Sequence, residues 1–166
     1  MQEKLPANAP FQIPYQSLIP ETVDGLIAAE KSISVSHIVN GCTRLQPVVM
    51  LIGQAAGAAA ALSVKQNVDP RNLDVHKLQK VLLDAGCQLF PYKDLWNHHA
   101  DFSTVQYLAL NGVFVDSDEF TFGPDVIISE EEAKQLVQNL KLKIDFKELT
   151  GLKRSEAYLK IFKLTF

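Results

Sequence analysis

The sequence predicts a mainly α-helical fold with a short strand contribution. From Val48 to Val64 only Gln54 and Ser63 are strongly polar, which predicts a long apolar helix that is buried on most sides. Asp74 and Ser129 are both good helix-initiating residues, and each precedes apolar residues at helical spacing. These patterns predict a helical chain with few strands.

The composition limits the class of protein. The chain has 166 residues, 47% of them hydrophobic, and a formal net charge of −3. This is enough for a packed core in one domain or two small ones. The absence of a Lys/Arg cluster argues against nucleic acid and membrane headgroups as partners. Two cysteines without C-x-x-C spacing are too few for a disulfide scaffold and leave the cellular compartment open.

The first predicted domain spans residues 1–90. Leu26–Ala29 is a short, continuously apolar run, typical of a buried strand in a parallel sheet. A loop is expected to follow this strand. Thr43-Arg44-Leu45-Gln46 then has the pattern of a capping box that begins the long helix, with Pro47 in its first turn. The long helix could also span a membrane by length, but its polar residues favour a buried soluble helix.

Small residues recur every four positions along this helix, at Gly53, Gly57 and Ala61. One side therefore has little side-chain bulk, so another backbone or a flat ligand can come close. Each interior glycine costs roughly 0.5–1 kcal/mol relative to alanine, so the stripe is expected to have a purpose. At the helix start, Gly41, Cys42 and Thr43 are expected to leave N–H groups free for an anionic or carbonyl-rich ligand.

A second helix is expected to begin at Asp74 and to end before Gly86 as a C′ glycine. Leu73 and Leu78 have the spacing of a hydrophobic staple. The expected buried stripe consists of Leu78, Val81, Leu82 and Ala85.

The second predicted domain, residues 91–166, is a small helical module. A short helix is expected to end at Asn111-Gly112, and Ser129 with Glu132 forms a second capping box. One more helix is expected within residues 142–166. Its solvated face is expected to hold the basic residues Lys153, Arg154, Lys160 and Lys163.

The first domain resembles a known family. The matching residues are Pro14-Tyr15, Ser17-Leu18-Ile19-Pro20, Leu26-Ile27-Ala28-Ala29, Ile33-Ser34-Val35-Ser36-His37, Thr43-Arg44 and Gly53-Gln54-Ala55-Ala56-Gly57. This ordered series resembles the C-terminal segment of FAD-dependent oxidoreductases with a glutathione-reductase-type flavin fold. The module after it loosely resembles a surface-layer-homology repeat.

The resemblance implies a role beside the flavin. In such enzymes the strand ends beside the ribityl chain, and the helix N-terminus faces the pyrimidine edge of the isoalloxazine ring. A helix N-terminus stabilises the negative charge of a reduced flavin. The implied cofactor-binding residues are Ala29, Glu30, Gly41, Thr43, Gln46, Gly53 and Gly57. Glu30 stands where many relatives have glycine, so its carboxylate is expected to bond a ribityl hydroxyl instead.

Two residues are candidates for catalysis. Arg44 lies in the turn that would face the flavin and could orient a substrate carboxylate bidentately; an ion pair with a nearby acid is the alternative. His37 could donate or accept a proton near the same ring, and a structural hydrogen bond is the alternative. The implied reaction is hydride transfer between FAD and a small organic or sugar-derived substrate. Some family members are labelled putative xanthan lyase.

The motif that binds the FAD pyrophosphate, G-x-G-x-x-G, does not occur in the sequence. The resemblance therefore implies a C-terminal fragment of an α/β FAD-binding fold, whose partner is the N-terminal nucleotide-binding half of the same protein. Alone, the chain is expected neither to retain FAD nor to catalyse a reaction. The competing hypothesis is a non-catalytic module that binds a partner or a cell-envelope polysaccharide.

No metal site is expected. His98-His99 with Asp94 and Asp101 lacks further zinc ligands. Asp116-Ser117-Asp118 begins like a calcium loop, but the later ligand positions are not acidic.

Overall fold

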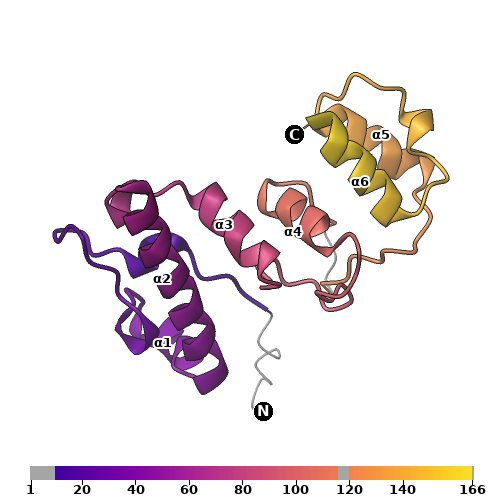
Figure 1. Cartoon of the computed structure of the whole chain (residues 1–166). Coiled ribbons are helices and arrows are strands. Elements are labelled where there is room, and N and C mark those ends of the chain that lie inside the picture. Colours follow the sequence, from indigo (N-terminus) through magenta and orange to yellow (C-terminus); the bar gives the residue numbers. More distant parts are fainter. Residues whose placement is uncertain (1–9, 116–119, 166) are drawn as a thin grey trace, which may run out of the picture. The chain divides into compact units, whose positions relative to one another are not determined.

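The computed structural model describes residues 10–115 and 120–165 (Figure 1). Helices dominate this part of the chain, and its only strand-like pairing is an antiparallel bridge between Ile127 and Lys153. The α-helices are α1 His37–Thr43, α2 Gln46–Gln66, α3 Val75–Asp84, α4 Phe102–Leu110, α5 Glu130–Asn139 and α6 Arg154–Thr165. The predicted mainly helical fold is confirmed.

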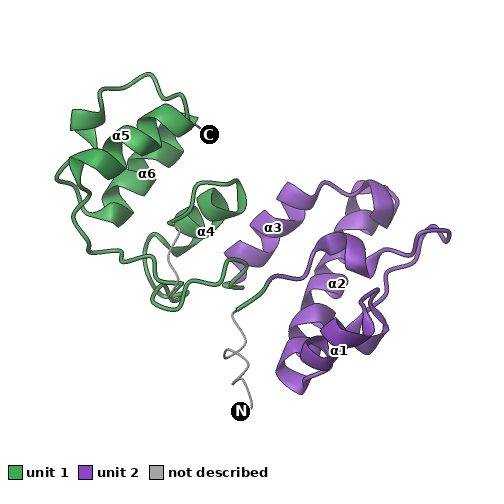
Figure 2. Cartoon of the chain, turned by 180° about the vertical axis from the view of Figure 1, so that it is seen from behind, with its two compact units in different colours: residues 1–11, 86–166 green, residues 12–85 purple. Residues whose placement is uncertain are grey.

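The chain forms two compact units (Figure 2). One unit comprises residues 12–85, and the other comprises residues 1–11 together with 86–166. The predicted domain assignment of residues 1–90 and 91–166 stays a prediction.

Helix α2 organises the unit of residues 12–85. Its buried side repeats every three or four positions and consists of Val49, Ile52, Ala56, Ala59 and Ser63. Ile52 and Ala56 pack in one cluster with Leu18 and Ile33, which come from the segments before α1. Helix α2 also contacts α3 and the short 3-10 helices Glu30–Ser32 and Pro70–Asn72. Helix α2 therefore supports the segments before α1 and those that follow it as far as α3.

The other side of α2 is exposed, which corrects the expectation that this helix is buried on most sides. Met50 is 73% exposed and Val64 is 83% exposed. Only 28% of the most apolar window of α2 is buried, and by length and composition alone this helix could cross a membrane. The apolar run predicted burial because exposed apolar surface is unfavourable, but the described residues cover one face only.

The predicted strand Leu26–Ala29 is not a strand in this structure. The segment is extended, and the Ala28 amide donates to the Leu18 carbonyl at 2.7 Å. Leu26 is 50% exposed. A β-strand needs at least one neighbouring strand to pair with, and the described part of the chain supplies none for this segment.

The segment before α2 is a helix rather than the predicted loop. Helix α1 begins after Ser36, whose hydroxyl accepts from the Val39 amide at 3.3 Å. Thr43 is the last residue of α1, and its hydroxyl donates to the Val39 carbonyl at 3.3 Å. The capping box predicted at Thr43 is therefore wrong. Leu45 is the N-cap of α2 and makes no side-chain cap, while Pro47 lies in the first turn as predicted.

Helix α3 begins as predicted and differs in its buried stripe. The Asp74 carboxylate accepts from the His76 amide at 3.0 Å, and Gly86 follows the helix with φ +77°. Leu78 and Leu82 are buried, but Val81 is 41% exposed and Ala85 is exposed as well, while Leu83 is buried. The cap is confirmed, and the predicted stripe is wrong at two of its four positions.

The unit that contains residues 86–166 has helices where the caps predicted them. Helix α4 ends at Leu110, with Asn111 as its C-cap and Gly112 at φ +86°. The Ser129 hydroxyl accepts from the Glu132 amide at 3.1 Å and begins α5. Within residues 142–166, α6 takes only the second half, because residues before Arg154 include the 3-10 helix Phe146–Glu148 and a turn.

Arg154 corrects the predicted solvated face. Its side chain is 13% exposed, and it forms a bidentate ion pair with Glu132, with N···O distances of 2.8 and 3.1 Å. Arg154 also donates to the Phe122 carbonyl. The guanidinium thus joins α6 to α5 and to the loop before α5, a contact between residues far apart in the sequence.

Candidate functional site

The backbone turns sharply at Glu30. Ala29 is partly buried against the cluster around Leu18, and Glu30 then opens the 3-10 helix Glu30–Ser32 with φ +55°. This left-handed conformation is uncommon for a residue with a Cβ atom and easy for glycine. The resemblance implies that many relatives have glycine at the position of Glu30, and the backbone there has a conformation that suits glycine.

Gly41 and Thr43 do not have the free N–H groups expected of them. Both lie in the last turn of α1, where amide groups bond to carbonyls one turn earlier. Gly41 is exposed, and a Cβ atom built on it would have no neighbour within 4 Å. Thr43 is buried, with 2% exposure.

The free helix terminus belongs to α2 and lies slightly later in the sequence. The Val49 amide already bonds to the Leu45 carbonyl at 2.9 Å, and Pro47 has no N–H group. The first-turn donors are therefore Gln46 and Val48. Since Leu45 provides no side-chain cap, the positive end of the helix dipole points to this turn without a capping oxygen from that residue.

The glycine stripe lies on the open side of α2. A Cβ atom at Gly53 or Gly57 would meet nothing within 4 Å, and Gly57 is exposed. Met50 and Val64 lie on the same side, because they are separated from Gly57 by about two helical turns in either direction. Close approach of another group to this stripe stays a prediction.

Arg44 and His37 are both exposed. Arg44 is the C-cap of α1, and its amide donates to the Asn40 carbonyl at 3.2 Å. His37 is the first residue of α1. Within residues 10–115 and 120–165, neither side chain makes an ion pair or hydrogen bond. The alternatives, an ion pair for Arg44 and a structural hydrogen bond for His37, therefore have no partner among these residues. Their catalytic roles stay predictions.

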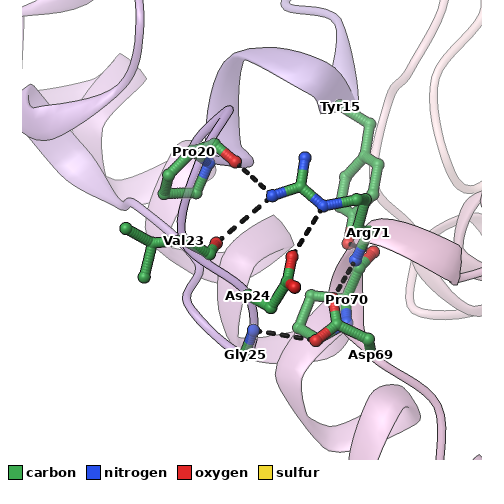
Figure 3. Close-up of polar contacts among 8 residues, drawn as sticks. All are labelled: Tyr15, Pro20, Val23, Asp24, Gly25, Asp69, Pro70 and Arg71. Carbon is green, nitrogen blue, oxygen red and sulfur yellow. Dashed lines mark hydrogen bonds and ion pairs between the residues drawn. The ribbon is translucent and has the colours of Figure 1, made fainter.

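Sequence reasoning missed a polar network that holds the loop before Ala29 (Figure 3). Arg71 donates from Nε to an Asp24 carboxylate oxygen at 2.9 Å, and from Nη2 to the carbonyls of Pro20 at 2.7 Å and Val23 at 3.3 Å. The Asp69 carboxylate accepts from the Gly25 amide at 2.8 Å and from the Arg71 amide at 2.9 Å.

Tyr15 joins the same network, and its hydroxyl donates to the Pro70 carbonyl at 2.9 Å. Burial, reinforced by the nearby Asp69 carboxylate, raises the pKa of Tyr15. The phenol therefore stays a donor at neutral pH. Apart from the local bond between Asp69 and the Arg71 amide, the partners in this network lie 44 to 55 residues apart, and no local sequence pattern predicts those contacts.

Asp94 and His99, two of the residues weighed as zinc ligands, have structural hydrogen bonds. The two Asp94 oxygens accept from the amides of Phe122 and Gly123 at 2.7 and 2.6 Å, and His99 Nδ1 accepts from the Asp101 amide at 3.2 Å. The described residues contain no group of three His, Cys, Asp or Glu side chains placed to hold a metal ion. The segment Asp116-Ser117-Asp118 lies outside the described residues.

Comparison with known proteins finds a similarity in the first half of the chain. Residues 2–82 match the family model described as FAD dependent oxidoreductase. This segment is therefore similar to the FAD-dependent oxidoreductase family. That family implies FAD binding in its parent enzymes, and the matched segment includes α1, α2 and the candidate residues on both. Neither the curated proteins nor the solved structures gave a significant match.

Proposed function

We propose that residues 12–85 cover the pyrimidine side of the flavin in an FAD-dependent oxidoreductase, and that this chain is a C-terminal fragment of that enzyme. The observation that carries the proposal is the open side of α2, where apolar residues 73% and 83% exposed flank two glycines with nothing above them. Exposed apolar surface of this kind marks a face that another group covers.

The residues on this face fit a flavin ring. A flat ring or a backbone can lie against Gly53 and Gly57 without displacing a side chain. The Gln46 and Val48 amides lie at the positive end of α2, and such a terminus favours negative charge. Bound FAD supplies hydride transfer, and this helix end would hold the charge that the reduced ring acquires.

Arg44 and His37, which precede the start of α2, act on the substrate. Arg44 binds a substrate carboxylate and orients it, because its guanidinium is exposed and has no acidic partner among the described residues. His37 exchanges a proton with the substrate from the exposed start of α1. The substrate class is a small organic molecule or sugar derivative, and the label putative xanthan lyase is retained only as a family association.

The partner of this fragment is the nucleotide-binding half of the same protein. A polypeptide cover suits α2 better than lipid, because the opposite face of the helix is fixed to Leu18, Ile33 and two 3-10 helices that carry exposed polar groups. Without the partner, the fragment retains no FAD and has no activity, since the residues that hold the pyrophosphate lie elsewhere.

Gly57→Leu tests this proposal in two settings. In the 166-residue chain, leucine meets open space and removes a helix glycine, so stability rises by roughly 0.5–1 kcal/mol. In the full-length flavoenzyme the same leucine occupies the place of the ring or its supporting backbone, and flavin content falls to near zero. Lys80→Leu, which adds leucine to the exposed side of α3, is the matched control and retains flavin.

Normal flavin content in purified full-length Gly57→Leu protein would contradict the proposal. Loss of flavin together with unfolding of the isolated chain would contradict it as well, because the substitution would then act on the fold rather than on the covered face.

A further inference from the structure

The network around Arg71 converges on the loop that leads to Ala29 and Glu30. The three acceptors of the Arg71 guanidinium lie within residues 20–24, and Asp69 holds the next residue, Gly25, through its amide at 2.8 Å. Gly25 has φ +71°, a left-handed conformation that glycine adopts readily and that forms part of this turn. Four contacts thus fix one short loop from the segment that follows α2.

Hydrogen bonds and packing restrain the backbone that follows this loop. From Gly25 the backbone is extended, the Ala28 amide bonds to the Leu18 carbonyl at 2.7 Å, and Ala29 packs on the core. Glu30 follows in the left-handed conformation. The position of Glu30 is therefore set at one end by the loop of residues 20–25 and at the other by the 3-10 helix that packs on α2.

We propose that Arg71 and Asp69 are positioning residues that fix where the Ala29–Glu30 backbone meets the flavin. This inference rests on the proposed function above. Neither side chain touches the cofactor; both act through the loop of residues 20–25. The network in Figure 3 joins the segment of Asp69 to Arg71, which follows α2, to the loop of residues 20–25, which precedes Ala29 and Glu30. We expect it to keep that loop and α2 in one relative position within this unit.

The geometry explains why arginine occupies this position. Nε and Nη2 donate in different directions, to one carboxylate and two carbonyls. A lysine has donors on a single nitrogen and cannot reach all three acceptors together. The ion pair itself contributes little, because the Asp24 side chain is 78% exposed. The carbonyl contacts are therefore the part whose loss matters.

Amide hydrogen exchange with and without FAD tests the inference in the full-length flavoprotein. Arg71→Lys is expected to speed exchange at residues 21–28 about tenfold while α2 stays protected, and to speed flavin dissociation by a similar factor. Asp69→Asn, which removes one of two carboxylate acceptors, is expected to expose the Gly25 amide selectively. Lys80→Ala, which removes an exposed ion pair in α3, is the control and should match the wild type.

The outcomes separate this inference from the proposed function. If FAD slows exchange at residues 25–30 and 46–48 in the wild type but Arg71→Lys behaves like the wild type, the positioning role is overturned and the flavin role stands. Equal loosening of the whole unit in Arg71→Lys would also overturn it. If FAD slows no exchange in the wild type, both proposals fail. The local exchange of Arg71→Lys in the flavin-free 166-residue chain shows whether the variant still folds.

Discussion

Glu30 stores backbone strain, and a glycine substitution should release it. At φ +55° a residue with a Cβ atom loses about 1–2 kcal/mol relative to the right-handed conformation. Glycine removes this cost but loses more freedom on folding, which takes back about 0.5–1 kcal/mol. Glu30→Gly should therefore stabilise residues 12–85 by a net amount of about 0.5–1 kcal/mol.

Glu30→Ala is the matched control for this substitution. It removes the same exposed carboxylate and keeps the Cβ atom that causes the strain, so it should lack the stabilisation. The difference between the two variants isolates the backbone effect, and we expect it to be about 1 kcal/mol in favour of glycine.

Hydrogen exchange of the slowest α2 amides under increasing urea measures this difference. The single tryptophan, Trp96, lies in the other unit and would report on the wrong part of the chain. A Glu30→Gly variant that is less stable than Glu30→Ala would refute the reasoning, because the left-handed backbone would then carry no cost for a side chain.

Two further predictions concern the unit that contains residues 86–166. Glu132→Gln should destabilise it by about 1–3 kcal/mol because Arg154, 13% exposed, loses its carboxylate; Glu130→Gln, in an exposed pair with Lys134, should cost about 0.5 kcal/mol or less. Urea unfolding followed by Trp96 fluorescence measures both, and equal losses would contradict the first. Burial raises the pKa of Tyr92 to about 12 and raises the pKa of Tyr158 as well. Their stabilisation is complete below about pH 10 and is lost as the pH rises toward 12. Tyr158→Phe should flatten this dependence of the unfolding free energy, and an unchanged slope would contradict the assignment.

Local chemistry was the part of the fold that could be predicted from the sequence. Asp74, Ser129 and Gly86 begin or end helices through groups within three residues, so the pattern contains the whole interaction. Thr43 shows the limit of such patterns. The same hydroxyl that could cap a following helix instead bonds back to Val39, because a short helix precedes it.

Contacts between distant residues could not be predicted in the same way. Arg154 looked like one of several surface cations, and only the packing of α6 beside α5 gives it Glu132 as a partner. Arg71 likewise depends on a loop more than 40 residues earlier. The apolar run of α2 predicted burial on most sides and was wrong for the side of Met50 and Val64, because hydrophobicity is non-directional and does not say which faces the chain covers.

The visible absorption spectrum of the native protein, taken with its intact mass, tests the central claim most directly. We predict a flavin spectrum in a protein longer than these 166 residues, and no flavin in the 166-residue chain by itself. A colourless native protein would contradict the flavin-covering role and would favour a non-catalytic interaction module. Stoichiometric flavin on the isolated chain would contradict the proposal that the nucleotide-binding half is required.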